Sequence, residues 1–279
     1  MTAGSSLGRR VSEDPRDIPL LVLSFDGYAD IWPVFFAFFR KNWPDCPFPV
    51  YLSTNVKTYE GPGVIALPTG PEVTWATRLR RALEALNSDY VLLVLEDFLF
   101  YERVDTAEVL RLARVALEER VGCLRLAPNP APSRPVEGHE DLGVVLPDDP
   151  YRVTSQVAFW HVDTLLQFLD PSYSIWDFEF HASVHGPIPT RPMWARWKPA
   201  IVYRDCISRG RWMPWGIATC RTAGVPIDFD TRGRMTGSHL WRLYYGYARG
   251  LVFWALPRSV QRRRWRRIVA RETARRKTG

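Results

Sequence analysis

The chain has 279 residues, of which 46% are hydrophobic and 13% aromatic, enough to bury the core of one large domain or of two small ones. No run of about 18 apolar residues occurs, so no membrane-spanning helix is expected. The polar segment Met1 to Asp17 lacks the apolar region of a secretory signal, which predicts a cytoplasmic protein. The cysteines form no C-x-x-C pair and no Cys/His cluster, which argues against a disulfide framework or a structural zinc site and predicts reduced, mostly buried thiols; they are Cys46, Cys123, Cys206 and Cys220.

The net charge of +7 is distributed unevenly along the chain. Residues 234–279 contain 13 Lys and Arg and a single acid, Glu272, whereas the first 233 residues contain 24 basic and 29 acidic residues. Because a nucleic-acid-binding fold usually carries basic residues on its core elements, no nucleic-acid partner is expected. Arginines mixed with aromatic residues are typical of segments at an anionic membrane surface, which would place the protein peripherally at the inner face of the membrane. Packing of this tail on the body or on a partner subunit is the alternative.

The hydrophobic pattern alternates between strands and helices in the first half of the chain. Short apolar runs predict strands, and apolar spacing at i, i+3, i+4 and i+7 predicts helices. The predicted strands span 20–25, 49–53, 63–67, 90–95 and 121–126, and the predicted helices span 31–41, 75–86 and 105–119. This alternation predicts an α/β fold with a mostly parallel sheet flanked by helices.

The second half has a different texture. Prolines at positions 128, 130, 132 and 135 predict a long loop without regular structure to about residue 149. Beyond it the predicted elements are an extended segment at 151–155, helices at 162–169 and 176–183, a strand at 200–203, and two helices from 240 onward that Pro257 separates. The predicted organisation is a flexible N-terminus (1–18), a catalytic body (19–233) and a basic, aromatic, helical C-terminal extension (234–279).

The segment Val91 to Leu95 runs directly into two carboxylates, Glu96 and Asp97. An apolar run of this kind is typical of a strand buried on both faces of a parallel sheet. Ligands of open α/β sheets bind just beyond the carboxyl ends of such strands. Because buried acids cost free energy unless a cation meets them, the pattern favours a divalent metal that carries a phosphorylated ligand. The structural alternative is that the two acids cap a turn or pair with an arginine.

Several stretches together resemble GT-A-type glycosyltransferases. Trp75-Ala-Thr-Arg-Leu, followed by Asp89-Tyr-Val-Leu-Leu-Val-Leu-Glu-Asp-Phe-Leu, resembles the nucleotide-sugar half of these enzymes. Tyr151 to Trp160 and then Trp176-Asp-Phe-Glu179 resemble the acceptor half of a bacterial subgroup that builds surface polysaccharides and glycosylated small molecules, and Arg209-Gly-Arg-Trp212 resembles a basic turn that follows it. The resemblance spans residues 19–230. It implies a Rossmann-type, GT-A-like fold, a nucleotide-sugar donor and a hydroxyl-bearing acceptor.

The resemblance also implies a bound Mg²⁺ or Mn²⁺, held in the family by an acidic D-x-D motif. Here the motif departs from the pattern, because it reads Glu96-Asp97-Phe98. Asp97 is the expected metal ligand, and Glu96 is expected to contact the metal or the ribose. The alternative is that Arg209 and Arg211 neutralise the diphosphate, since guanidinium groups match phosphate oxygens well.

The remaining binding residues follow from the same resemblance. Asp26, at the end of the first strand, is expected to contact the base or the ribose, and Arg78 is expected to reach the diphosphate. Gln156, Trp160 and Trp176 are expected to form an acceptor platform, because aromatic faces stack on sugar rings. The structural alternatives are a solvated arginine on a helix face and tryptophans buried in the core.

The segment Trp176-Asp-Phe-Glu179 supplies the candidate catalytic base. By resemblance Glu179 is expected to take the proton of the acceptor hydroxyl while the anomeric carbon is attacked, with inversion. Asp177 is the second candidate for this role. Acids are also enriched in first helical turns because of the helix dipole, which is the structural alternative for both residues.

Other functions leave different signatures. The chain has no G-x-S-x-G, Walker A or G-x-G-x-x-G motif, which disfavours nucleophilic hydrolases, P-loop kinases and Rossmann dehydrogenases. A sugar-nucleotide nucleotidyltransferase and a non-enzymatic adaptor that binds membranes or nucleic acid stay as alternatives. All the expected site residues precede Arg232, so the tail is expected to be dispensable for donor chemistry.

Overall fold

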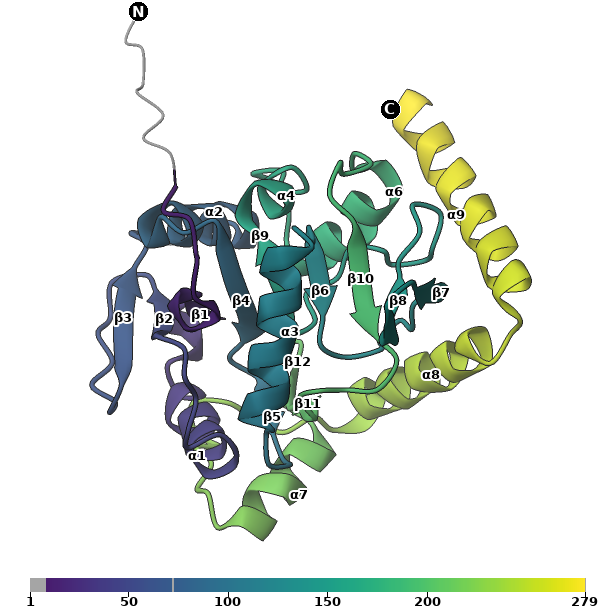
Figure 1. Cartoon of the computed structure of the whole chain (residues 1–279). Coiled ribbons are helices and arrows are strands. Elements are labelled where there is room, and N and C mark those ends of the chain that lie inside the picture. The colour runs from purple at the N-terminus through teal and green to yellow at the C-terminus, as the bar shows by residue number, and fades with distance from the viewer. Residues whose placement is uncertain (1–8, 72, 279) are drawn as a thin grey trace, which may run out of the picture.

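The computed structural model describes residues 9–71 and 73–278, and it confirms the predicted α/β fold (Figure 1). In this part of the chain, nine strands form the central sheet in the order β3-β2-β1-β4-β9-β6-β10-β8-β7. The strands of this sheet are β1 (Leu20–Leu23), β2 (Val50–Thr54), β3 (Val64–Pro68), β4 (Tyr90–Leu95), β6 (Cys123–Arg125), β7 (Arg134–Val136), β8 (His139–Val144), β9 (Ala158–His161) and β10 (Met193–Arg196). Two short ribbons pair β5 (Phe98–Phe100) with β11 (Tyr203–Asp205) and β12 (Ile207–Ser208) with β13 (Arg211–Trp212).

The direction of the strands divides the sheet into two parts. Strands β3, β2, β1 and β4 are parallel neighbours. Strand β9 runs antiparallel between β4 and β6, and β8 runs antiparallel to both β10 and β7. Among the described strands of this sheet, β9 and β8 therefore run opposite to the other seven, and the mostly parallel sheet is as predicted.

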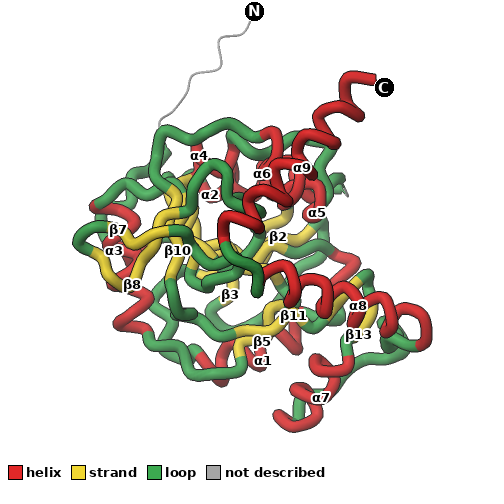
Figure 2. The backbone as a smooth tube through the Cα atoms, turned by 90° about the vertical axis from the view of Figure 1, so that its right-hand side faces the viewer, coloured by secondary structure: helices red, strands yellow, loops and turns green. Residues whose placement is uncertain are grey.

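Helices cover both faces of the sheet and extend beyond it (Figure 2). The α-helices are α1 (Trp32–Asn42), α2 (Trp75–Leu86), α3 (Thr106–Glu118), α4 (Val162–Leu166), α5 (Ile175–Asp177), α6 (Ser183–His185), α7 (Pro214–Ala223), α8 (Gly237–Trp254) and α9 (Arg258–Thr278). A π-helical turn, η3 (Phe178–Ala182), joins α5 to α6, and 3-10 turns lie at η1 (Pro15–Asp17) and η2 (Asp26–Tyr28).

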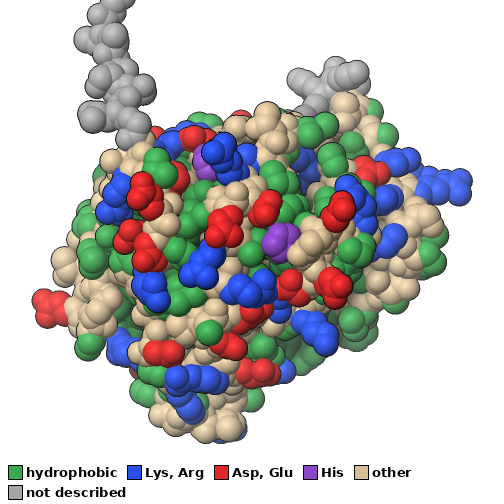
Figure 3. Space-filling view, viewed as in Figure 1, with side chains coloured by type: hydrophobic (Ala, Val, Ile, Leu, Met, Phe, Trp, Pro, Cys, Tyr) green, Lys and Arg blue, Asp and Glu red, His purple; other side chains and the backbone are tan. Residues whose placement is uncertain are grey.

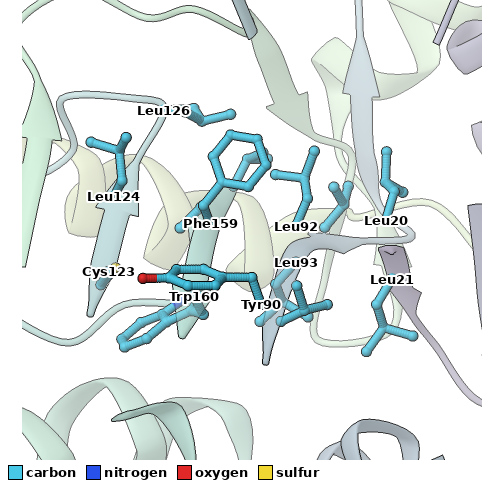
Figure 4. Close-up of a cluster of buried hydrophobic side chains, with 14 of the residues drawn as sticks. Leu20, Leu21, Tyr90, Leu92, Leu93, Cys123, Leu124, Leu126, Phe159 and Trp160 are labelled. Carbon is cyan, nitrogen blue, oxygen red and sulfur yellow. The ribbon is translucent and has the colours of Figure 1, made fainter. Parts of the chain in front are cut away.

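Buried hydrophobic side chains of β1, β4, β6 and β9 pack together in the core (Figure 4). All six residues of β4 are buried, and the strand lies inside the sheet between β1 and β9, as expected for a strand whose two faces are both covered. Each Val or Leu buried in this way contributes roughly 1.5–3 kcal/mol relative to an exposed side chain. The predicted strand at 90–95 is confirmed. Because β4 is packed on all sides, it fixes the position of Glu96 and Asp97, which directly follow it.

Local chemistry explains why two of the helices begin where the sequence predicts. The Thr74 hydroxyl caps α2 by accepting a hydrogen bond from the backbone N–H of Thr77, and α2 ends at Asn87, whose φ of 49° is left-handed. The Asp105 carboxylate caps α3 in the same way, by accepting from the N–H of Glu108. Such caps stabilise a helix by about 1 kcal/mol.

The prediction of one long loop to residue 149 is wrong. Strands β7 and β8 form a hairpin within that segment and extend the sheet past β10. Pro135 lies in β7, the outermost described strand, at a register shift against β8, and edge strands and bulges are where proline occurs in sheets. Gly138, with a φ of 76°, makes the turn between the two strands.

Other differences are shifts or omissions. The predicted strand at 200–203 begins at Tyr203 instead, and residues 151–155 are not extended as a strand. The pattern gave no prediction for β9, β10 or α7. The two C-terminal helices and their break at Pro257 are confirmed.

The ends of the chain differ in how they meet the body. Residues 1–8 of the predicted flexible N-terminus lie outside the described residues, and Arg10 next to them pairs with Ser88 in a short parallel bridge. Helices α8 and α9 run along one side of the molecule (Figures 1 and 2). Among the described residues, no helix combines the length and the apolar character needed to cross a bilayer.

Candidate functional site

A cleft of about 620 Å³ lies beyond the carboxyl ends of β1 and β4, which is the edge that the sequence predicts for a ligand. Its lining brings together many of the expected site residues from distant parts of the chain. They are Arg78, Glu96, Asp97, Gln156, Trp176, Glu179 and Arg209. Residues that the sequence analysis did not name also line it, among them Tyr28, Ser155, Tyr203, Asp205 and Tyr247.

Three acids crowd the inner end of the cleft. Glu96 directly follows β4 and is only 8% exposed, and burial raises its pKa to about 7. Burial also raises the pKa of Asp97 well above its usual value, and the negative charges of Glu96 and Asp205 raise it further. Asp205 enters from β11, which pairs with β5 so that Asp205 faces Phe98. The group is therefore electrostatically unfavourable as it stands, and a cation would relieve it.

The acids suit a cation that brings other ligands with it. Among the described residues, no group of three or more His, Cys, Asp or Glu side chains is arranged to hold a metal ion unaided. Mg²⁺ usually takes one or two carboxylates from the protein and completes its shell with waters and substrate phosphates. Glu96 and Asp97 match that requirement.

The three expected arginines occupy different environments. Arg78 of α2 is 6% exposed, donates to the Ser24 carbonyl at 3.3 Å and lies 4.5 Å from the centre of the Phe25 ring, so it is not on a solvated helix face. Arg209 is exposed, has a φ of 50° in the β12–β13 turn and lines the cleft. Arg211 is exposed on β13 and is not among the described residues of the lining.

Asp26 holds a loop. Its carboxylate accepts hydrogen bonds from the backbone N–H groups of Asn55, Val56 and Lys57 at 2.9–3.1 Å. These bonds fix the segment that follows β2. In the described structure Asp26 itself does not line the cleft, although its neighbours Phe25 and Tyr28 do.

Glu179 is fixed firmly within the cleft. Its Oε1 accepts three hydrogen bonds, from the Thr154 hydroxyl at 3.1 Å, the Ser155 N–H at 2.8 Å and the Ser155 hydroxyl at 2.6 Å. The residue lies in the π-helical turn η3, and such turns occur frequently at functional sites. The carboxylate is thus held in one orientation at the surface of the cleft.

Asp177 caps a helix instead of facing the cleft. It forms a capping box with Ser174, in which its Oδ2 accepts from the Ser174 N–H at 3.0 Å and from the Ser174 hydroxyl at 2.6 Å. The hydrogen bonds from Ser174 hold the pKa of Asp177 below its usual value. Asp177 lies outside the cleft lining formed by the described residues, as the helix-cap interpretation predicts.

The three expected acceptor residues lie in two different places, the cleft and the core. Trp176 is 68% exposed and lines the cleft, and the Gln156 side-chain oxygen accepts a hydrogen bond from the Tyr203 hydroxyl there. Trp160 is fully buried in β9 and packs edge-on against Phe168, so it belongs to the core. The buried-tryptophan alternative therefore describes Trp160.

Two residues of the lining were missed for different reasons. Asp205 follows the apolar run Ala200 to Tyr203, so the signal of an acid at a strand end was present in the sequence. Tyr247 belongs to α8, and its hydroxyl lies 3.5 Å from Asp205 Oδ2 while its ring packs edge-on against Trp215. No local pattern could reveal that contact, and it corrects the expectation that every site residue precedes Arg232.

Comparison with known proteins finds solved structures of similar fold and low sequence identity. No protein-family model matches the sequence, and no curated protein matches it significantly. One similar solved structure is residues 1–349 of TarS from S. aureus, with 14% identity, a TM-score of 0.39, and coverage of 67% of this chain and 59% of that one.

Two further structures are similar to the chain. The mannosyltransferase PcManGT from Pyrobaculum calidifontis, solved with GDP-Man and Mn²⁺, has 13% identity, a TM-score of 0.41 and coverage of 72% of this chain and 61% of that one. The 2-C-methyl-D-erythritol 4-phosphate cytidylyltransferase from Thermus thermophilus has 16% identity, a TM-score of 0.42 and coverage of 75% of this chain and 100% of that one. The chain thus spans about three fifths of the length of the TarS fragment and of the mannosyltransferase chain.

Proposed function

We propose that this protein is a nucleotide-sugar-dependent glycosyltransferase that transfers a sugar to a hydroxyl group of an acceptor. One observation carries the proposal. A single cleft contains both an acid pair, the buried Glu96 and the half-buried Asp97, and a separate, firmly oriented carboxylate, Glu179. Glycosyl transfer requires two such groups, one to hold the charged leaving group through a cation and one to accept the hydroxyl proton.

The donor would bind at the inner end of the cleft. Glu96 and Asp97 would hold Mg²⁺ or Mn²⁺, which when bound neutralises the diphosphate. Arg78 and Arg209 line the same cleft and would contact phosphate oxygens, because guanidinium groups donate in a geometry that matches them. Asp26 would act indirectly, by holding the loop after β2 beside the nucleotide.

The acceptor would bind near Trp176 and Gln156. The exposed face of Trp176 is available to stack on a sugar ring, and Gln156 would donate or accept hydrogen bonds from its hydroxyls. The Glu179 carboxylate would take the proton of the attacking hydroxyl. The new bond forms at the anomeric carbon as the bond to the diphosphate oxygen breaks, which inverts the configuration. By resemblance, the acceptor would belong to surface-polysaccharide assembly or to the glycosylation of small molecules.

The products of the reaction test the proposal. Purified protein is incubated with a panel of nucleotide sugars and with Mg²⁺ or Mn²⁺, and the released nucleotide is identified by chromatography. A glycosyltransferase releases a nucleoside diphosphate, through slow donor hydrolysis or transfer. Release of pyrophosphate from a nucleoside triphosphate and a sugar phosphate would instead identify a nucleotidyltransferase and overturn the proposal.

A binding measurement completes the test. A ligand that binds the folded state raises its melting temperature, so a matching nucleoside diphosphate should raise the thermal midpoint, and more strongly with the cation present. No shift with any nucleoside diphosphate, with or without metal, would contradict a nucleotide-binding cleft and favour a non-enzymatic role for the body.

A further inference from the structure

The outward side of α8 carries a continuous apolar stripe. Trp241, Tyr244, Tyr245, Leu251 and Val252 are each between 52% and 73% exposed. Their spacing of three, four and seven residues places them on one face of the helix. Large exposed apolar surfaces of this kind on a folded protein mark interaction sites.

Helix α8 contacts the body through Tyr247, which is 45% exposed, and none of the described residues of α8 is buried. Tyr247 meets Trp215 and Asp205 at the cleft, so α8 borders the site directly. Helix α9 secures the other end of the tail, because Trp265 is 3% exposed and packs 5.0 Å from the Tyr151 ring. The outward stripe is therefore presented in a fixed orientation.

Arginines anchor or surround the two helices. Arg262 is anchored to the body, where it donates to Asp149 at 2.9 Å. Arg242 and Arg249 are exposed on α8 beside the apolar stripe, and on α9 the exposed arginines include Arg263, Arg264 and Arg267. Basic side chains gather over α9 at the right-hand edge in Figure 3.

The composition of this surface identifies one class of occupant. A helix with an aromatic and aliphatic stripe flanked by arginines matches the interface of an anionic bilayer, where the stripe enters the headgroup region and the arginines meet lipid phosphates. Association with a second copy would bring together two tails that each contain 13 basic residues and one acid between residues 234 and 279. Leu251 and Val252 have no stacking surface for nucleic-acid bases.

We propose that α8 lies on an anionic lipid surface through Trp241, Tyr244, Tyr245, Leu251 and Val252, and that this seats the cleft next to the lipid. Tyr247, on the inward side of the same helix, is the link between the two. The docking does not depend on the proposed chemistry, so it is tested separately from it.

Vesicle flotation tests the docking. The full chain is mixed with vesicles of phosphatidylcholine and phosphatidylglycerol, or of phosphatidylcholine alone, at low and high salt. We expect binding to the anionic vesicles at low salt and release at high salt. Serine at Trp241, Leu251 and Val252 together should weaken binding at least about tenfold, and Arg242→Gln or Arg249→Gln should each weaken it roughly fivefold.

The control variant replaces two apolar residues of similar exposure elsewhere on the body. Val11 and Ile188 are 68% and 72% exposed, and serine at both should leave flotation unchanged. Equal thermal midpoints for all variants show that they are folded.

Three outcomes would overturn the proposal. They are flotation that the stripe variant does not reduce, absence of flotation, and salt-sensitive binding to an oligonucleotide that depends on the stripe. A dimer in light scattering that the stripe variant dissociates would assign the surface to a second copy instead. Loss of docking with nucleotide binding retained would leave the proposed function standing.

Discussion

The cleft contains two acidic regions that are built in opposite ways. Glu96 and Asp97 lie where a fully buried strand ends, and burial together with neighbouring negative charge raises the pKa of Asp97, while burial alone raises that of Glu96. Glu179 instead receives three hydrogen bonds on one oxygen, from Thr154 and Ser155. The first region is electrostatically unfavourable as it stands, whereas the second is already hydrogen-bonded and oriented.

The difference separates binding from proton transfer. A carboxylate whose charge is unfavourable in the unliganded protein is typical of a binding site, where a bound ligand offsets that charge. A carboxylate that accepts a proton benefits from a fixed position, because a general base must lie within hydrogen-bond distance of the proton that it takes. The two regions should therefore respond differently to the same kind of mutation, from acid to amide.

The largest effect is expected for Asp97→Asn. The change removes one of the mutually repelling charges while keeping the shape, so the thermal midpoint should stay the same or rise. Nucleotide-sugar turnover should fall on the order of 10³-fold, because the cation that neutralises the leaving group loses a ligand. Calorimetry and nucleoside diphosphate release measure the two effects. The exposed Asp230→Asn variant serves as the control, and a parallel loss of stability and activity would show that Asp97 is structural.

The next effect concerns Glu179→Gln. An amide keeps the hydrogen bonds to Oε1 but cannot accept a proton, so kcat should fall about 10²–10⁴-fold while donor binding is unchanged. The matched control is Asp177→Asn, two residues earlier and outside the described cleft lining. An active Glu179→Gln alongside an inactive Asp177→Asn would transfer the base to Asp177, and full activity in both would end the carboxylate-base mechanism.

Much of the first region was predictable from the sequence. The run from Val91 to Leu95 indicated a buried strand, and the rule for the carboxyl ends of strands then placed Glu96 and Asp97 at the ligand edge, where the structure has them. The caps of α2 and α3 were equally local. An apolar run and a helix cap both depend on residues that are close in sequence, so they can be read without knowledge of the tertiary structure.

Other features of the structure depended on contacts between distant parts of the chain. The sequence analysis predicted no strand at β9, although Val157 to Trp160 is a short apolar run, and the place of β9 between β4 and β6 follows only from the fold. Trp160 resembled an acceptor residue but points into the core, because its direction follows from the register of β9 against β4. Tyr247 reaches Asp205 from 42 residues away. Tertiary packing decided each of these placements.

A smaller effect is expected for Tyr247→Phe. Removal of the hydroxyl takes away the contact with Asp205 but keeps the packing on Trp215. Because a contact of 3.5 Å is at the long limit of a hydrogen bond, it contributes less than the roughly 1 kcal/mol of a typical one, so KM for the donor should rise by at most about fivefold with little change in kcat. Steady-state kinetics measure both constants. Tyr244→Phe, on the outward stripe of α8, is the control and should leave both unchanged. An equal rise in KM for both variants would show that α8 acts through stability.

The smallest effect concerns the helix cap at Asp177. The hydrogen bonds from Ser174 lower the pKa of Asp177, so the ionised carboxylate is favoured in the folded state. Its stabilisation is then present above the unfolded pKa and is lost as the pH falls through the folded pKa. Ser174→Ala should lower the free energy of unfolding by about 0.5–1 kcal/mol at neutral pH, as expected for an exposed cap. Denaturant unfolding at neutral and acidic pH measures this, and the difference between variant and wild type should shrink in acid. A difference that stays constant with pH would show that Ser174 acts through packing, while Glu179 nearby would keep its hydrogen bonds in either case.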